Sequence, residues 1–143
     1  MAEQIKVKYF TDIDKLEKIS VGDLIDLRAA EDVVMRAGDY RLIPLGVAMQ
    51  LPKGYKANVY PRSSTFGNYH ILMTNSVGQI DWSYRGNNDQ WMFPAYATQN
   101  TIIHKNDRIC QFEIVRKQPE IEFVEVETLD NEDRGGFGST GVH

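Results

Sequence analysis

The chain has 143 residues, of which 42% are hydrophobic and 25% charged, and its formal net charge at pH 7 is −4. This size and composition fit one folded domain rather than a disordered chain. The acidic balance argues against stable nucleic-acid binding, which needs a basic stripe, although a few arginines and a metal ion can still hold a phosphorylated small molecule. No apolar run approaches the ~20 residues that cross a bilayer, and no secretory signal is visible, so we expect a cytoplasmic protein without membrane association.

Short apolar runs separated by turn residues follow one another along the chain. They predict strands at residues 5–10, 24–27, 40–45, 47–51, 57–60, 71–74, 91–97, 109–115 and 121–126. Many short strands at this spacing favour a sandwich or jelly roll. Because proline cannot donate to a ladder, Pro94 predicts that its strand is an edge or carries a bulge.

Helix is scarce, with one or two turns expected at residues 12–19 and a single turn at 63–66. From residue 131 onward the apolar pattern disappears and glycine dominates. We therefore predict an all-β, single-domain jelly-roll or β-barrel-like fold over residues 1–130, followed by a flexible arm over 131–143.

The single cysteine, Cys110, excludes a disulfide framework and a cysteine-rich zinc site. Its strand-like setting favours a small buried hydrophobe over a reactive thiol.

The first polar segment, Pro61 to Thr65, places three hydroxyls beside the guanidinium of Arg62. Hydroxyls and backbone N–H groups next to an arginine suit a phosphate. The alternative is a helix start with a serine as N-cap and Arg62 on the surface.

The second segment runs from Asn75 to Gly86, and Asp81 stands within it between an apolar residue and Trp82. A carboxylate partly desolvated by aromatic neighbours, here Trp82 and Tyr84, suits a general base. The alternative is an aspartate that caps a turn between strands.

The third segment is the tail from Arg134 to Gly141, with four glycines, two hydroxyls and Phe137. Glycine lets the backbone approach a phosphate closely, and the ring can stack on a base. The alternative is a frayed terminus without function.

Five blocks in a fixed order connect these segments. They are Asp26-Leu27-Arg28-Ala29, Pro61-Arg62-Ser63-Ser64, Asn75-Ser76-Val77-Gly78 with Ile80-Asp81 and Tyr84-Arg85-Gly86, Arg108-Ile109-Cys110-Gln111, and the Gly-Phe-Gly-Ser-Thr-Gly tail. This arrangement resembles the trimeric dUTPase family over nearly the whole chain. The resemblance implies hydrolysis of dUTP to dUMP and pyrophosphate, which keeps uracil out of DNA and supplies dUMP.

The resemblance also implies a role for each residue of the third block. Asp81 would be the base that activates the attacking water, and Tyr84 would lie against the sugar and exclude a 2′-hydroxyl. Asn75, with backbone groups of a tight hairpin including Gly78 and Ile80, would read the uracil edge.

The other blocks would bind the phosphates, by the same resemblance. Arg62, Ser63, Ser64 and Gln111 would hold the phosphate chain, while Asp26 would hold water bound to Mg²⁺, the implied cofactor. In the tail Phe137 would stack on uracil, and Arg134, Gly138, Ser139 and Thr140 would close on the phosphates. The family implies a homotrimer whose sites draw on all three chains.

The chain departs from the family pattern in three places. Arg134 and Phe137 are separated by two residues instead of the usual four, Ser64 replaces a glycine, and the turn at 86–89 is longer. These departures suggest a divergent subgroup of the bacterial or phage type.

Two alternatives stay open. One is dCTP deaminase, which shares the fold but needs a glutamate beside the base, absent from the strand at residues 90–94. The other is a dUTP-binding regulatory protein that acts through a protein partner. A zinc nucleotide deaminase is excluded because it needs several cysteine ligands.

Overall fold

In the computed structural model, which describes residues 1–138, the chain forms eleven short strands and one short helix. The elements are β1 (Lys6–Tyr9), β2 (Ile25–Arg28), β3 (Val33–Met35), β4 (Tyr40–Pro44), β5 (Val47–Gln50), β6 (Tyr55–Pro61), α1 (Thr65–Tyr69), β7 (Ile71–Met73), β8 (Gly78–Ile80), β9 (Met92–Ala97), β10 (Thr101–Ile103) and β11 (Arg108–Arg116).

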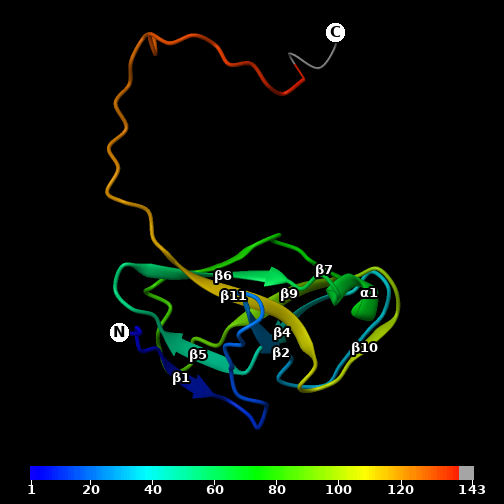
Figure 1. The fold of residues 1–143 in the computed structure, drawn as a ribbon. Helices are drawn as coiled ribbons and strands as arrows, with labels where there is room; N and C mark the ends of the chain where they lie inside the picture. Colours follow the sequence, from blue (N-terminus) through cyan, green and yellow to red (C-terminus); the bar gives the residue numbers. More distant parts are fainter. Residues whose placement is uncertain (139–143) are drawn as a thin grey trace.

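Two sheets and two strand pairs build the body of the molecule (Figure 1). One sheet has the order β2-β11-β6-β8 and the other β4-β9-β7, while β1 pairs with β5 and β10 with β3. All of these pairings are antiparallel. The predicted all-β, jelly-roll-like fold is therefore confirmed.

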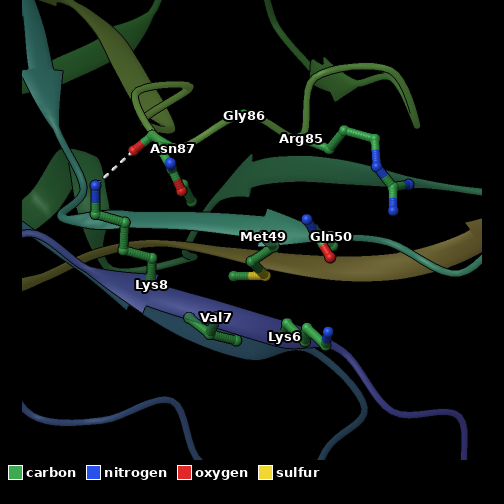
Figure 2. A pocket seen from close by; sticks show the side chains of 9 residues that line it. Lys6, Val7, Lys8, Met49, Gln50, Arg85, Gly86 and Asn87 are labelled. Carbon is green, nitrogen blue, oxygen red and sulfur yellow. Dashed lines mark hydrogen bonds between the residues drawn. The ribbon is translucent and has the colours of Figure 1, made fainter.

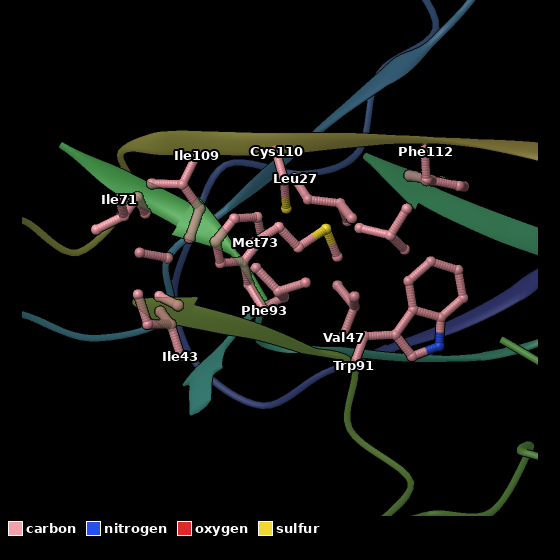
Figure 3. Packing of buried hydrophobic residues seen from close by; sticks show 14 of the residues in the cluster. Leu27, Ile43, Val47, Ile71, Met73, Trp91, Phe93, Ile109, Cys110 and Phe112 are labelled. Atoms are coloured by element: carbon pink, nitrogen blue, oxygen red, sulfur yellow. The ribbon is translucent and has the colours of Figure 1, made fainter. Parts of the chain in front are cut away.

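A single apolar core lies between the two sheets, and Figure 3 shows its middle. Side chains of β11 face those of β7 and β9, and the rings of Trp91 and Phe112 meet edge to face with centroids 5.2 Å apart. Cys110 is fully buried among them, and burial raises the pKa of its thiol well above the usual value. Cys110 is thus the small buried hydrophobe that its strand setting predicted.

Three strands lie outside the predicted runs, namely β3, β8 and β10. Two of them, β3 and β10, escaped prediction because they are short and lack polar alternation. In β3 and β10 the middle residues, Val34 and Ile102, are exposed but apolar, so no period of two is visible in the sequence. They pair with each other across the two strands.

The strand predicted at residues 121–126 is wrong for this structure. These residues are exposed and pair with no strand of the described chain. Alternation alone does not make a strand, because its backbone groups need a neighbouring strand and its apolar side chains need a surface to cover.

The helical turns predicted at residues 12–19 are also wrong. The backbone N–H groups of Asp14 and Leu16 donate to Asn106 Oδ1 and to the Tyr9 hydroxyl, each at 2.8 Å. These side-chain acceptors hold the segment in a non-helical path over β1. The single turn expected at 63–66 does form, displaced by two residues, as α1.

Pro94 does not mark an edge strand, since β9 pairs with β4 on one side and β7 on the other. Its carbonyl accepts a hydrogen bond from Thr74 N at 3.0 Å, so its missing N–H faces the β7 side. There β7 has already ended at Met73. Proline is tolerated because the strand that would need its N–H stops one residue earlier.

The chain leaves the body after β11 and extends away from it (Figure 1). Residues 117–135 are exposed and carry seven acidic side chains. Exposed apolar side chains accompany them, including Phe123 and Leu129. A domain boundary at residue 130 and the flexibility of the arm remain predictions.

Within residues 1–138, no helix is long and apolar enough to cross a membrane.

Phe93 offers a test of the core. It is fully buried in β9, so Phe93→Ala should lower the free energy of unfolding by about 3–5 kcal/mol. Urea denaturation at a fixed protein concentration measures this. The same substitution at Phe66, which is 49% exposed on α1, is the matched control and should cost less than about 1 kcal/mol. Equal losses at the two positions would contradict the placement of the core.

Candidate active site

Asp81 directly follows β8, where the chain leaves the edge of the four-stranded sheet. Its Oδ2 accepts hydrogen bonds from the Ser83 backbone N–H at 2.9 Å and from the Ser83 hydroxyl. The hydrogen bond from the Ser83 hydroxyl is the largest cause that lowers the pKa of Asp81. The bond from the Ser83 backbone N–H and the positive charge of Lys117 lower it further. The carboxylate is therefore ionised at neutral pH.

A hollow of about 460 Å³ lies next to this carboxylate. It is lined by Leu42, Asn75, Gln79, Ile80, Asp81, Ser83, Tyr84, Gln90, Trp91, Met92 and Pro94. Apolar walls with a few convergent polar groups are typical of small-molecule sites. Four of the predicted site residues, Asn75, Ile80, Asp81 and Tyr84, therefore meet at one pocket.

The turn between β7 and β8 shapes one wall of this pocket, but it is not a β-hairpin. The two strands belong to different sheets, so the turn crosses from one sheet to the other. Ser76 adopts a left-handed backbone conformation with φ of 61°, and Val77 N donates to Asn75 O at 2.6 Å. At Gly78 an added Cβ would lie 3.0 Å from Met73 Cε, so the close approach favours glycine.

Tyr84 is held at the mouth of the pocket by a hydrogen bond from its hydroxyl to Gln90 O at 2.8 Å. The Gln90 side chain in turn accepts from Gly46 N at 2.9 Å. Partial burial, followed by the charge of Asp89, raises the pKa of the Tyr84 hydroxyl, which stays neutral. Gln90 thus connects the Tyr84 ring to the turn between β4 and β5.

A second group of predicted residues gathers around Asp26 on β2. Arg62 Nε lies 3.1 Å from Asp26 Oδ1, and Arg108 Nη1 lies 3.4 Å from Oδ2. Both carboxylate oxygens thus face a guanidinium. Gln111 Nε2 donates to Pro61 O at 3.1 Å, which brings the fourth block against the second.

The three hydroxyls after Arg62 do not share one role. Thr65 is buried, and its hydroxyl accepts from Arg62 N at 2.7 Å and donates to Ile109 O at 2.8 Å. Ser64 is the N-cap residue of α1 but makes no side-chain capping bond, and Ser63 is exposed. The phosphate-binding role of Ser63 and Ser64 remains a prediction, whereas Thr65 ties the loop to β11.

The two groups lie far apart within one chain. The strand order puts three strand spacings, about 14 Å, between β2 and β8. The register also offsets Asp81 from Asp26 by four residues along β6, which is about 13 Å in the direction of the strands, at right angles to the first distance. Asp26 and Asp81 are therefore separated by roughly 20 Å.

Within residues 1–138, the tail extends away from the body and from both groups (Figure 1). Phe137 is fully exposed with a left-handed φ of 50°, and Arg134 Nη1 donates to the neighbouring Gly135 O at 3.2 Å. Gly138 is also exposed on this extended segment. The predictions for Ser139 and Thr140 fall outside the described residues.

The loop that carries Asp81 also borders a second, basic recess of about 200 Å³ (Figure 2). Lys6 and Lys8 of β1 line it together with Arg85. Lys8 Nζ donates to Asn87 O at 2.8 Å, and Arg85 Nη1 donates to Leu51 O at 3.4 Å. These bonds anchor the far half of the loop to the body.

Three residues of the site were missed in the sequence. Ser83, two residues after Asp81, has the spacing of a local side-chain turn, which could have revealed it. Arg108 contacts Asp26 only because β11 pairs with β2. The Gln90 carbonyl accepts the hydrogen bond of the Tyr84 hydroxyl because the loop between them folds back. No local signal predicts these last two contacts.

Comparison with solved structures places this fold among those of dUTPases. A dUTPase of Staphylococcus bacteriophage 80alpha, solved with dUpNHpp, superposes with a TM-score of 0.79 over 99% of this chain and 100% of that chain, at 23% identity. A Streptococcus mutans dUTPase gives a TM-score of 0.71 over 81% of this chain and 98% of that chain, at 22% identity. At such identities these likenesses establish the class of fold.

Sequence relatives carry the assignment further. The dUTPase family model matches residues 10–141. A prophage-derived deoxyuridine 5′-triphosphate nucleotidohydrolase of Bacillus subtilis, from SPbeta, is 55% identical over 97% of this chain and 99% of its own length. A Finegoldia magna deoxyuridine 5′-triphosphate nucleotidohydrolase is 41% identical over 82% of this chain and 83% of its own. The chain belongs to the dUTPase family.

Proposed function

We propose that the chain hydrolyses dUTP to dUMP and pyrophosphate. The observation that carries the proposal is an ionised aspartate, Asp81, at the edge of a pocket closed on one side by Tyr84. Family membership and the dUTP nucleotidohydrolase relatives name the substrate. In the cell this reaction would keep uracil out of DNA and supply dUMP.

The nucleoside would enter the pocket beside the β7–β8 turn. Asn75 and the backbone around Gly78 and Ile80 would hydrogen-bond the uracil edge, and the tight turn would leave no room for thymine's methyl group. The braced ring of Tyr84 would lie against the sugar and reject a 2′-hydroxyl.

The triphosphate would bind the Asp26 group of another chain. Arg62, Ser63, Ser64 and Gln111 present a guanidinium, two hydroxyls and an amide, which suit phosphate oxygens. Arginine neutralises charge on the phosphates and fixes their orientation, which is most of what phosphoryl chemistry requires of a protein.

The donor set suits a hydrated Mg²⁺ carried by the phosphates. Among residues 1–138, no three His, Cys, Asp or Glu side chains converge as a metal site. Asp26, a lone carboxylate between two arginines, could accept hydrogen bonds from metal-bound water. When bound, Mg²⁺ would neutralise the phosphate oxygens and polarise the scissile phosphorus. A structural Mg(II) ion is coordinated in the related phage phi11 dUTPase.

In the reaction, Asp81 would take a proton from a water molecule as that water attacks the α-phosphorus in line with the leaving pyrophosphate. The bond from water oxygen to phosphorus forms while the α,β-bridging bond breaks, and pyrophosphate leaves with the bond's electrons. The arginine group would stabilise the charge that builds up on the leaving oxygens.

A homotrimer with shared sites accounts for the separation between Asp26 and Asp81. The outer face of β4-β9-β7 is a continuous exposed apolar surface, made by Tyr40, Leu42, Leu72, Met92 and Tyr96. Such a surface usually marks an interface. Leu42 and Met92 also line the Asp81 pocket, so a second chain on this face would lie beside the pocket.

The tail would complete the site from a third chain. Its exposed apolar residues lack cover within residues 1–138 of their own chain. Phe137 would stack on uracil while Arg134 and the glycine-rich backbone, including Gly138, close on the phosphates. Closure of this kind excludes water and adds donors.

Deamination is disfavoured because Asp81 is the sole carboxylate among the described residues lining the pocket, and no glutamate faces it. Phage 80alpha dUTPases are reported to control transfer of virulence genes, but at 21–22% identity that likeness concerns fold alone.

Asp81→Asn tests the base. It should lower kcat for dUTP by roughly 10²–10⁴-fold with little change in substrate affinity, because the amide cannot take the proton. Pyrophosphate release with Mg²⁺ is the measurement, run with dUTP, dCTP, dTTP and UTP. The exposed Asp12→Asn is the control and should match the parent chain. No pyrophosphate from dUTP with the parent chain would overturn the proposed function itself.

Mixing two inactive variants tests the sharing of sites. Asp81→Asn and Arg62→Ala, co-refolded in equal amounts, should recover about a quarter of parental activity, because one site in four then combines intact residues from different chains. The measurement is pyrophosphate release after mixing, compared with each variant alone. Activity no higher than the sum of the two would mean that each site is built within one chain.

Removal of residues 134–143 tests the tail. The truncated chain should lose roughly 10²-fold or more in kcat, since closure over the substrate is abolished. Its urea midpoint should stay unchanged, because Arg134, Phe137 and Gly138 pack against no core residue. Full activity after truncation would assign the tail no catalytic part.

A further inference from the structure

We propose that Ser83 is the positioning residue of the base: it holds one oxygen of Asp81 and leaves the other to take the proton. This inference rests on the proposed role of Asp81 as the base. Two donors of one residue, the backbone N–H at 2.9 Å and the side-chain hydroxyl, end on the same oxygen, Oδ2. Oδ1 is the oxygen that Ser83 does not engage.

A carboxylate on an exposed loop would otherwise rotate freely about its terminal bond, whose torsional preference is broad. Two hydrogen bonds from a fixed partner define the carboxylate plane and thereby the direction of the lone pairs on Oδ1. A general base depends on that direction, since the proton must travel along it to the acceptor.

Ser83 can serve this purpose because its loop is held at both ends: β8 pairs with β6 just before Asp81, and several contacts follow Ser83. The Arg85 guanidinium lies 4.4 Å from the centroid of the Trp82 ring, and Arg85 also donates to Leu51 O. The Tyr84 hydroxyl donates to Gln90 O at 2.8 Å. Beyond Arg85, Lys8 binds Asn87 O (Figure 2). The residues on either side of Ser83 are thus tied to the body at several points.

The same contact controls ionisation. The Ser83 hydroxyl is the largest cause of the lowered pKa of Asp81, followed by the Ser83 backbone N–H, while the charge of Lys117 and the Trp82 backbone N–H contribute less. Lys56, Arg116 and Glu120 line the recess on the other side of Asp81, and their charges partly cancel.

The pKa of Asp81 sets the acidic limb of the pH profile. The base acts only when ionised, so kcat/KM falls as the pH drops through the pKa of Asp81. Removal of the hydroxyl raises that pKa, and the acidic limb of the profile then moves to higher pH.

The isosteric pair Ser83→Thr and Ser83→Val separates the hydroxyl from the shape of the side chain. The threonine variant keeps the donor, and the valine variant removes it. We expect the acidic limb of kcat/KM for dUTP to stay in place with threonine and to move upward with valine. The valine variant should also lose roughly tenfold or more in kcat, the usual scale for a lost hydrogen bond to a charged group. Ser20→Ala, in the exposed N-terminal loop, is the control.

A direct titration keeps the inference separate from the proposed function. The pKa of the Asp81 carboxyl, followed by ¹³C NMR in the full chain, should rise in Ser83→Val and not in Ser83→Thr, whatever the enzyme hydrolyses. An unchanged pKa in the valine variant would overturn the role of Ser83. So would equal kinetic losses in both variants without a shift of the acidic limb, since these would mean that Ser83 only shapes the loop. An absent dUTPase activity together with the expected pKa shift would instead refute the proposed function alone.

Discussion

The pairing of β6 with two partners is the constraint on which the site depends. One edge of β6 pairs with β11 along seven residues, and the other pairs with β8 along three. The first pairing leads to the arginines around Asp26, and the second leads to Asp81. Because strands do not stretch, β6 fixes the distance between the two groups as firmly as it holds the sheet together.

That distance explains why each group has its own local supports. Asp26 lies between two guanidinium groups and offsets part of their mutual repulsion, and Thr65 fastens the Arg62 loop to β11. On the other side, Ser83 and Gln90 hold Asp81 and Tyr84. In the proposed reaction each half would be organised before substrate arrives, so binding energy would not be spent on ordering it.

The sequence predicted the fold class and most strands because alternation and turn residues are local properties. It also predicted that Asn75, Asp81 and Tyr84 lie together, since they belong to one loop and the turn before it. It failed where the outcome depends on a distant neighbour. Pro94 is tolerated in an inner strand because β7 ends at Met73, a fact carried by another part of the chain.

The same limit applies to the site. The contact between Arg108 and Asp26 joins residues 82 apart in the chain, and only the β2–β11 pairing creates it. Thr65 is turned away from the proposed phosphate site because its hydroxyl donates to Ile109 O on β11. Ser83 is different, because its contact spans two residues and a local turn could have been inferred from the sequence.

The charge of the exposed tail has a consequence for the molecule as a whole. Residues 119–138 contain seven of the 20 acidic residues and one of the 16 basic ones, so residues 1–118 carry 13 acids and 15 bases, a net charge of +2. The overall value of −4 is thus the sum of two regions of opposite sign. Exposed, extended segments are where proteases cut. A single cut near Pro119 would leave a body of net positive charge in place of an acidic protein. The body would then be attracted to negatively charged surfaces instead of positively charged ones.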